Sequence, residues 1–359
     1  MGDRMSGSIP RISVLMPVYN AAPYLHKAVE SILNQTVADF EFIIVDDGSE
    51  DASPAILDGY TDPRIVRLNN AKNVGITKSL NQGLQLARGE YVARMDADDI
   101  AHPLRFEKQL AFLSKHSEVG VLGTAVTYID ASGQELGTVK LPGDHNSAVW
   151  TLVFGNPFTH PTIMARRALL LEAGGYRLDG PAQDRELWIR LYRRTRFANL
   201  SEPLHWFRLH DTSVTSIRRK ARMGLVSSQY PEPDLFLRRQ FLQDVLGRDI
   251  SAEEVEWLTN SQRVQSTLDA GLDEAQIEAV VALMLEIFEA LVRQSIFVGD
   301  YSQVKQDLVK RIVAASRYSP QCVMPGRLAR QWRHPIRRRL LLALRLAAKM
   351  LNIWPEEWK

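Results

Sequence analysis

The stretch Tyr91-Val-Ala-Arg-Met-Asp-Ala-Asp-Asp99 places three carboxylates directly after a short apolar segment. Two earlier segments have a related form: Ile12-Ser-Val-Leu-Met16 is apolar, and Phe40-Glu-Phe-Ile-Ile-Val45 runs directly into Asp46 and Asp47. Short runs of β-branched and aromatic residues bounded by polar clusters predict strands. If these strands are parallel, their polar ends meet at one edge of the sheet, which is where open α/β sheets bind ligands.

Helical periodicity fills the segments between these strands. Apolar residues recur at helical spacing over residues 24–34 and 76–87, and a further short strand is expected at residues 65–68. This alternation predicts an α/β domain with a mostly parallel sheet and flanking helices. A turn signal at Asp130-Ala-Ser-Gly133 lies between two β-like segments within residues 119–141 and predicts an antiparallel hairpin. The complete sheet is therefore expected to be mixed.

The pattern changes along the chain and predicts three regions. Residues 1–217 carry the α/β pattern, residues 218–325 carry helical periodicity, and residues 326–359 are rich in basic side chains. Within the second region, Ser251 and Glu254 have the spacing of a capping box, which predicts a helix start. We therefore expect an α/β domain, a helical appendage and a basic amphipathic C-terminal segment.

The composition is that of an ordinary globular protein. The chain has 359 residues, 45% of them hydrophobic, and a formal net charge of +2, so overall charge does not select a polyanionic partner. Its one cysteine, Cys322, excludes an internal disulfide, a thiolate zinc site and a Cys-x-x-Cys redox pair. Because no signal peptide or membrane-spanning apolar run is recognisable, we expect a cytoplasmic protein.

The carboxylates that follow the strands allow two interpretations each. Asp96, Asp98 and Asp99 can hold a divalent cation, Mn²⁺ or Mg²⁺, which would neutralise a diphosphate, or they can form a solvated turn that caps the next helix. Asp46 can accept a hydrogen bond from a nucleobase or ribose, or open a turn completed by Gly48. The individual motifs leave these alternatives open.

Five segments, taken in order, form a combined pattern. They are Ser13-Val-Leu-Met-Pro-Val-Tyr-Asn20, Ile44-Val-Asp-Asp-Gly-Ser49, Asn73-Val-Gly75, Gly89-Glu-Tyr-Val-Ala-Arg-Met-Asp-Ala-Asp-Asp99 and Gly174-Gly-Tyr176. Together they resemble the family 2 glycosyltransferases, which have the GT-A fold. The resemblance covers residues 11–215 and does not extend over the C-terminal third. It implies a metal-dependent, inverting enzyme of the hexosyltransferase type that uses a nucleoside diphosphate sugar, with a UDP-sugar favoured.

The resemblance implies roles for residues near the nucleotide. Tyr19 would flank the base, although tyrosine at a strand end is also a common core residue. Pro17 would shape the same pocket through its backbone, and Asp46 would bond the base. Asp96 would lie near the ribose and the metal, and Asp98 would be the main metal ligand.

Further residues would act near the diphosphate. Asn73 precedes a glycine at a predicted helix start, where the backbone can approach an anion or simply form a capped turn. Lys72 and Lys78 are candidate diphosphate contacts. Arg208 and His210 belong to a segment that returns toward the metal and diphosphate in the family, so Arg208 is expected to bind the donor and His210 to bind the metal.

The chemical step is expected to use a general base. In the family this base is an Asp before a helix with a Leu-Trp signature, which matches Asp184, although a helix N-cap is the alternative. Gln183 replaces a carboxylate that often positions the acceptor in relatives, which puts inference about the acceptor in doubt. Asn156 and His160 are expected on the acceptor side.

The C-terminal segment has its own prediction. Residues 327–349 carry eight basic side chains and no acid, with leucines alongside. Such a segment can lie as an amphipathic helix on an anionic membrane, through residues 327–354, or pack as an ordinary helix with a solvated face. A peripheral position on the cytoplasmic face would suit a glycan or lipid-linked acceptor. We expect no nucleic acid partner, because no aromatic platform accompanies the arginines.

Rival functions of other classes are a nucleotide-sugar-binding protein without turnover and a membrane-associated scaffold. The presence of Asp46, Asp96, Asp98 and Asp184 together favours an enzyme. A nicotinamide dehydrogenase is disfavoured, because no Gly-x-Gly-x-x-Gly follows the first strand.

Overall fold

The computed structural model describes residues 9–177, 182–211, 233–263 and 274–317. The chain forms two compact units: residues 1–148 and 156–231 make the first, and residues 149–155 and 232–359 make the second. The expected boundary at 217/218 and the basic segment 326–359 lie outside the described residues. The sequence did not indicate that residues 149–155 would join the helical unit.

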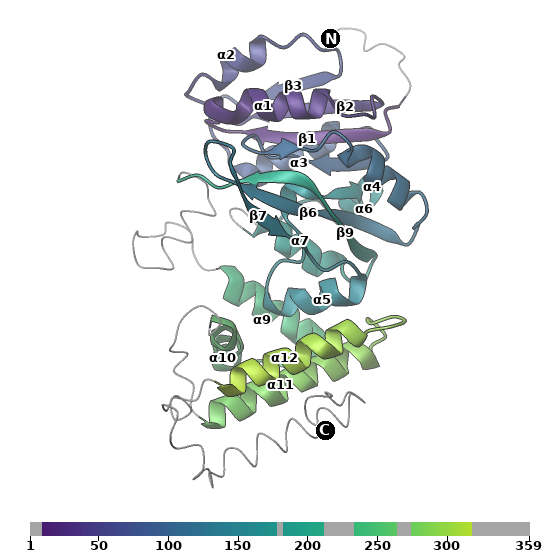
Figure 1. Cartoon of the computed structure of the whole chain (residues 1–359), viewed down its shortest axis with the longest axis vertical. Helices are drawn as coiled ribbons and strands as arrows, with labels where there is room; N and C mark the ends of the chain where they lie inside the picture. Colours follow the sequence, from purple (N-terminus) through teal and green to yellow (C-terminus); the bar gives the residue numbers. More distant parts are fainter. Residues whose placement is uncertain (1–8, 178–181, 212–232, 264–273, 318–359) are drawn as a thin grey trace. The chain divides into compact units, whose positions relative to one another are not determined.

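One mixed sheet organises the first unit (Figure 1). Its described strands follow the order β3-β2-β1-β4-β8-β6-β9-β5, with β7 paired to β6. Strands β1 to β4 are parallel, whereas β8, β7 and β5 join antiparallel. The N-terminal elements are β1 (Ile12–Val18), α1 (Ala22–Leu33), β2 (Phe40–Asp46), α2 (Ser53–Asp58), β3 (Ile65–Asn69), α3 (Ile76–Leu86) and β4 (Tyr91–Arg94). The predicted mixed α/β fold is confirmed.

The remaining elements of the first unit complete the sheet and cover it. The predicted hairpin is confirmed, because β6 and β7 pair antiparallel on either side of the turn. These elements are β5 (Ile100–Ala101), α4 (Arg105–Leu113), β6 (Val119–Ile129), β7 (Glu135–Val139), the first part of α5 (His145–Phe154), a 3₁₀ turn η1 (His160–Thr162), β8 (Met164–Arg166), α6 (Arg167–Glu172), α7 (Gln183–Leu191) and β9 (Arg196–Arg208).

Alternation along β1 explains how the sheet is covered on both faces. Val14 and Met16 are fully buried in a cluster that also contains apolar residues of α1 and α4. Leu15 points to the opposite face, where it packs so closely on α3 that a Cβ on Gly83 would lie 2.0 Å from its Cδ1. Because both faces are buried, β1 and β2 read as nearly continuous apolar runs rather than as alternating ones.

The strand register brings the polar ends together. Val18 at the end of β1 pairs with Asp46 at the end of β2, which in turn pairs with Asn69 of β3. On the other side of β1, Leu15 pairs with Arg94, the last residue of β4. The acidic stretch from Asp96 therefore follows β4 at the same carboxyl edge as Asp46, as expected for neighbouring parallel strands.

The second unit contains four described helices: α9 (Pro233–Leu246), α10 (Ala252–Arg263), α11 (Glu274–Arg293) and α12 (Ser302–Arg317). The predicted capping box is confirmed, because Ser251 N–H donates to Glu254 Oε2 at 2.7 Å and Glu254 N–H donates to Ser251 Oγ at 3.1 Å. Within the described part of the chain, no helix has both the length and the apolar character needed to span a bilayer.

Candidate active site

The three carboxylates that follow β4 form a compact cluster. Asp96, Asp98 and Asp99 each offer an oxygen, and these oxygens all lie within 4.8 Å of one another. Asp96 and Asp98 are partly exposed, whereas Asp99 is buried. Oxygen ligands presented from a rigid strand end suit a hard divalent cation such as Mg²⁺ or Mn²⁺. The donor set therefore fits the cation that the sequence predicted.

Burial and mutual repulsion shape the protonation of this cluster. Burial raises the pKa of Asp99 well above its usual value, and the charges of Asp98 and Asp96 raise it further. Burial also raises the pKa of Asp96, although the charge of Arg94 opposes this effect. A cation bound by these carboxylates would relieve the same repulsion, because it supplies the missing positive charge.

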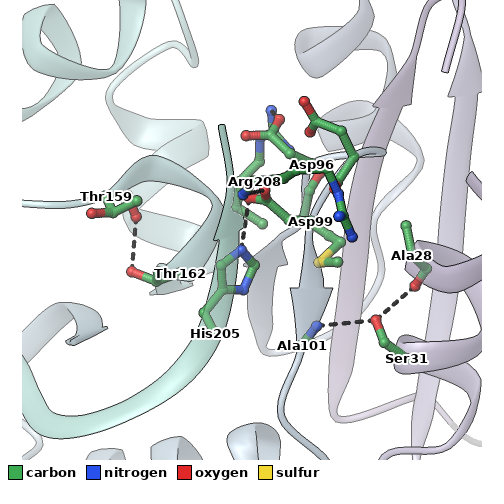
Figure 2. A network of polar contacts seen from close by, with 12 residues as sticks. Ala28, Ser31, Asp96, Asp99, Ala101, Thr159, Thr162, His205 and Arg208 are labelled. Atoms are coloured by element: carbon green, nitrogen blue, oxygen red, sulfur yellow. Dashed lines mark hydrogen bonds and ion pairs between the residues drawn. The ribbon is translucent and has the colours of Figure 1, made fainter. Parts of the chain in front are cut away.

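Asp99 is held from the side of β9 (Figure 2). Its Oδ2 lies 2.8 Å from Nε2 of the buried His205, and its Oδ1 accepts the Arg208 N–H at 2.8 Å. Next along the chain, Ala101 N–H donates to Ser31 Oγ at 3.1 Å, and Ser31 in turn donates to the Ala28 carbonyl. The acidic stretch is therefore fixed to both β9 and α1.

Arg94 supplies a buried positive charge beneath the cluster. Its guanidinium donates to Asp96 Oδ1 at 2.5 Å and to the Met95 carbonyl, and its side chain is 1% exposed. Arg94 stands within the acidic motif, but no local pattern in the sequence indicates this role. The pairing keeps one carboxylate of the cluster compensated inside the protein.

The segment that follows β9 reaches the cluster through His210, and the metal-binding role expected for His210 stays a prediction. His210 Nε2 lies 2.8 Å from Asp98 Oδ2, and its ring lies 5.0 Å from the ring of Tyr24. Arg208 is 1% exposed, and its guanidinium donates to the carbonyls of Asp98 and Asp130 at 2.8 and 3.1 Å. This arrangement gives Arg208 a supporting position, and its expected contact with the donor stays a prediction.

The loop after β2 is organised by Asp47 rather than by Asp46 alone. Asp46 is buried and accepts the Ser49 N–H at 3.1 Å. Asp47 accepts the N–H groups of Val74 and Gly75 at 3.0 and 2.9 Å, which holds the start of α3 beside the end of β2. The Asp46-Asp47 pair in the sequence could have indicated this role, because the second carboxylate is available to accept hydrogen bonds from a neighbouring loop.

Gly48 allows these two loops to meet. It has a φ of +71°, and a Cβ there would lie 2.5 Å from the backbone carbon of Lys72. Near this loop, Tyr19 is 48% exposed, Pro17 is partly exposed, and the side chains of Asn73, Lys72 and Lys78 are exposed. An exposed tyrosine ring at the strand end disfavours the alternative that Tyr19 is a core residue.

Asp184 lies in the first turn of α7 with both oxygens engaged. Its Oδ2 accepts from Asn156 Nδ2 at 2.5 Å, and its Oδ1 accepts the Arg185 N–H at 2.8 Å. Burial raises the pKa of Asp184, and these two hydrogen bonds oppose that rise only in part. A carboxylate with a raised pKa is better suited to accept a proton near neutral pH. The structure therefore brings Asn156 to the expected base.

His160 and Tyr176 form a further pair in the same unit. His160 Nε2 lies 2.9 Å from the Tyr176 hydroxyl, and burial lowers the pKa of His160 well below its usual value. Asn81 fixes Tyr176 by exchanging two hydrogen bonds with its backbone, at 2.7 and 2.9 Å. Gln183 beside the base is 6% exposed. Tyr176 belongs to the Gly174-Gly-Tyr176 motif, but its contacts with His160 and Asn81 could not be predicted from that motif.

The chain is similar to known glycosyltransferases. Residues 13–170 match the family described as Glycosyl transferase family 2. The Escherichia coli O-antigen biosynthesis glycosyltransferase WbnJ is 33% identical over 208 residues, which cover 56% of this chain and 81% of WbnJ. EpsE of Bacillus subtilis is 36% identical over 203 residues, which cover 55% of this chain and 72% of EpsE.

The chain belongs to glycosyl transferase family 2. This family 2 protein is a glycosyltransferase, as the order of its motifs predicted. Its fold resembles that of S. aureus TarS (residues 1–349, in complex with UDP-GlcNAc), with a TM-score of 0.57, 17% sequence identity and coverage of 96% of this chain and 93% of that one. The expected GT-A-type architecture is confirmed, including the helices of the C-terminal region.

Proposed function

We propose that this glycosyltransferase moves a sugar from a nucleoside diphosphate sugar, with a UDP-sugar favoured, to a hydroxyl of a glycan or lipid-linked acceptor. The proposed reaction depends on a divalent cation and inverts the anomeric carbon, with Asp184 as general base. One observation carries the proposal: carboxylate oxygens of Asp96, Asp98 and Asp99 lie within 4.8 Å of one another directly after β4, where they can hold a divalent cation. The proposed base, Asp184, is a buried carboxylate of the same unit and accepts a hydrogen bond from Asn156.

The proposed step assigns one task to each group. Asp184 takes the proton of the acceptor hydroxyl while that oxygen bonds to the anomeric carbon from the face opposite the diphosphate. The bond from the anomeric carbon to the diphosphate oxygen breaks, and its electron pair leaves with the diphosphate. A cation held by Asp96 and Asp98 would neutralise the charge of that leaving group. His210 orients the Asp98 carboxylate through their 2.8 Å contact.

The donor and acceptor classes rest on the relatives. WbnJ is named for O-antigen biosynthesis, which supports a cell-surface glycan as the acceptor. TarS is described in complex with UDP-GlcNAc, which supports a uridine nucleotide as the favoured donor. Residues 327–359, which lie outside the described residues, are proposed to associate with an anionic membrane near such an acceptor.

A thermal-shift screen of UDP-, GDP- and dTDP-sugars, each with and without Mn²⁺, tests the proposal. A ligand that binds only the folded state raises the melting temperature by mass action. We expect selective stabilisation by a UDP-sugar that requires Mn²⁺ and that EDTA abolishes. Stabilisation of equal size without the metal would reject metal dependence, and preference for another nucleotide would reject the UDP assignment alone.

A further inference from the structure

The helical unit contains a segment of α5 that ends directly before the active site residue Asn156. Residues 149–155 belong to the helical unit, and residue 156 begins the return of the chain to the first unit. Trp150 is 2% exposed, and its Nε1 donates to Asp307 Oδ2 on α12 at 2.8 Å. A buried indole N–H usually requires such a partner. The hydrogen bond therefore fixes the start of the segment to α12.

The other end of the segment is fixed as well. Arg238 on α9 is buried and donates from Nη2 to the Phe154 carbonyl at 2.7 Å. The guanidinium of Arg311 on α12 lies 3.9 Å from the centroid of the Phe154 ring. A cation that binds a free carbonyl at a helix C-terminus stabilises that end. Two helices of the unit thus hold Phe154, two residues before Asn156.

Asn156 has little freedom of its own. Its backbone is restricted because Pro157 follows it. Its Oδ1 accepts the Phe158 N–H at 3.1 Å, which orients the amide so that Nδ2 faces Asp184. The Pro157 carbonyl accepts a hydrogen bond from Asn199 Nδ2 at 3.1 Å. The position of the amide is therefore set by the backbone on both sides of residue 156.

We propose that Asn156 is a positioning residue for the Asp184 carboxylate, and that the contacts of residues 149–155 with α9 and α12 fix the chain that leads into Asn156. The inference rests on the proposed role of Asp184 as base. Trp150 and Phe154 lie in the helical unit with their partners, whereas Asn156 and Asp184 lie in the first unit, and the Gly155–Asn156 peptide bond joins the two sets of contacts.

The pKa of Asp184 can be measured directly and reports on its contact with Asn156. Selective ¹³C labelling of aspartate carboxyls in the full chain allows their titration by NMR, and loss of one signal in Asp184→Asn assigns that signal. Among the described residues, the charge of Arg185 lowers the pKa of Asp184, and the charge of Asp184 in turn raises the pKa of the buried Tyr176. Because Asn156 donates to the ionised carboxylate, Asn156→Ala should raise the pKa of Asp184.

Asn156→Asp gives a second test of the same contact. It retains an acceptor for the Phe158 N–H but places a like charge against Asp184, so the pKa of Asp184 should rise further than in Asn156→Ala. If Asn156 had a purely structural role, both variants would have a lower free energy of unfolding and an unchanged pKa of Asp184. An unchanged pKa of Asp184 in the folded variants would overturn the positioning role.

Trp150→Phe tests the contribution of the helical unit. It removes the N–H that binds Asp307 while keeping an aromatic ring, and the pKa of Asp184 should move in the same direction by a smaller amount. In the Asn156→Ala background, Trp150→Phe should add no further change, because the two act through one contact. Additive shifts, or no shift from Trp150→Phe, would overturn the link to the helical unit.

Glu286→Gln is the matched control within the helical unit. It breaks the exposed Arg248–Glu286 ion pair, whose atoms lie 2.7 Å apart and whose two partners are both outside residues 149–155. We expect the pKa of Asp184 to be unchanged in this variant. A shift equal to that of Trp150→Phe would show that general destabilisation of the helical unit causes the change, and would overturn the specific role of residues 149–155. Full transfer activity of Asp184→Asn would show that Asp184 is not the general base. The titrations of the Asn156 variants test the contact between Asn156 and Asp184 independently of that result.

Discussion

Asp99 and His205 lie 106 residues apart in the sequence and meet side chain to side chain, with Oδ2 and Nε2 separated by 2.8 Å. Both are 1% exposed. Burial lowers the pKa of His205 well below its usual value. Arg105 Nη1 lies 3.5 Å from His205 Nδ1, so the Nε2 side of the ring faces the carboxyl group of Asp99. The pair fixes the acidic stretch to β9, so loss of the His205 side chain should lower the free energy of unfolding.

His205→Leu should lower the free energy of unfolding by about 2 kcal/mol, because a buried carboxylate loses one hydrogen-bond donor. Urea denaturation of the metal-free protein measures this change. His116→Gln is the control, since His116 contacts Glu118 at a surface where both side chains are about half exposed. Surface pairs of this kind contribute less than about 1 kcal/mol. Equal losses in the two variants would contradict the buried role of His205.

Asp98→Asn should separate metal binding from stability. Burial, and in addition the charge of Asp98, raise the pKa of Asp96 and of Asp99, so removing that charge should raise the melting temperature of the metal-free protein. The same variant should lose the gain in melting temperature that Mn²⁺ gives the wild type, because a ligand is gone. Asp58→Asn is the control, as the Asp58 side chain is 72% exposed. A wild-type response to Mn²⁺ in Asp98→Asn would remove Asp98 from the metal site.

Asp184→Asn should lower the rate of sugar transfer by about a hundredfold to ten-thousandfold, which is the usual contribution of a general base. Donor binding should persist, because the carboxylate cluster is untouched. Steady-state transfer assays and calorimetric titration with the donor measure the two effects. Loss of donor binding together with activity would indicate that the substitution disturbs the fold of the site instead.

Stability should fall at mildly acidic pH because of buried histidines. Burial, and then the charge of Arg196, lower the pKa of His145 to about 4. The unfolded chain has a value of about 6.5, so it binds the proton first as pH falls. The contribution of His145 is complete above pH ~6.5 and is lost as pH drops through the window toward the folded value. Unfolding free energies measured across this range should decline.

His145→Gln isolates this effect. Glutamine can still accept the hydrogen bond that the Phe197 N–H donates to His145 Nδ1 at 3.2 Å. The variant should show a dependence on pH that is shallower by about one proton over the same window. An unchanged slope would show that other groups carry the acid sensitivity.

The sequence determined much of the first unit. Apolar runs such as Ile12–Met16 that end in turns or acids indicated parallel strands, because a strand buried on both faces must be apolar along its length. The Asp130–Gly133 turn indicated the hairpin, because glycine there adopts a positive φ, 98° at Gly133. The family followed from the order of short motifs. These patterns are local in the sequence, so they can be recognised without knowledge of the fold.

Tertiary structure alone decided which polar groups meet. No periodicity joins Asn156 to Asp184 or His205 to Asp99, because each pair depends on the register of distant strands and loops. The sequence also did not show that residues 149–155 belong to the helical unit, since α5 is one continuous helix whose apolar residues are not confined to one face. Local pattern sets which segments form strands and helices, whereas packing between remote segments sets the surroundings of each charge.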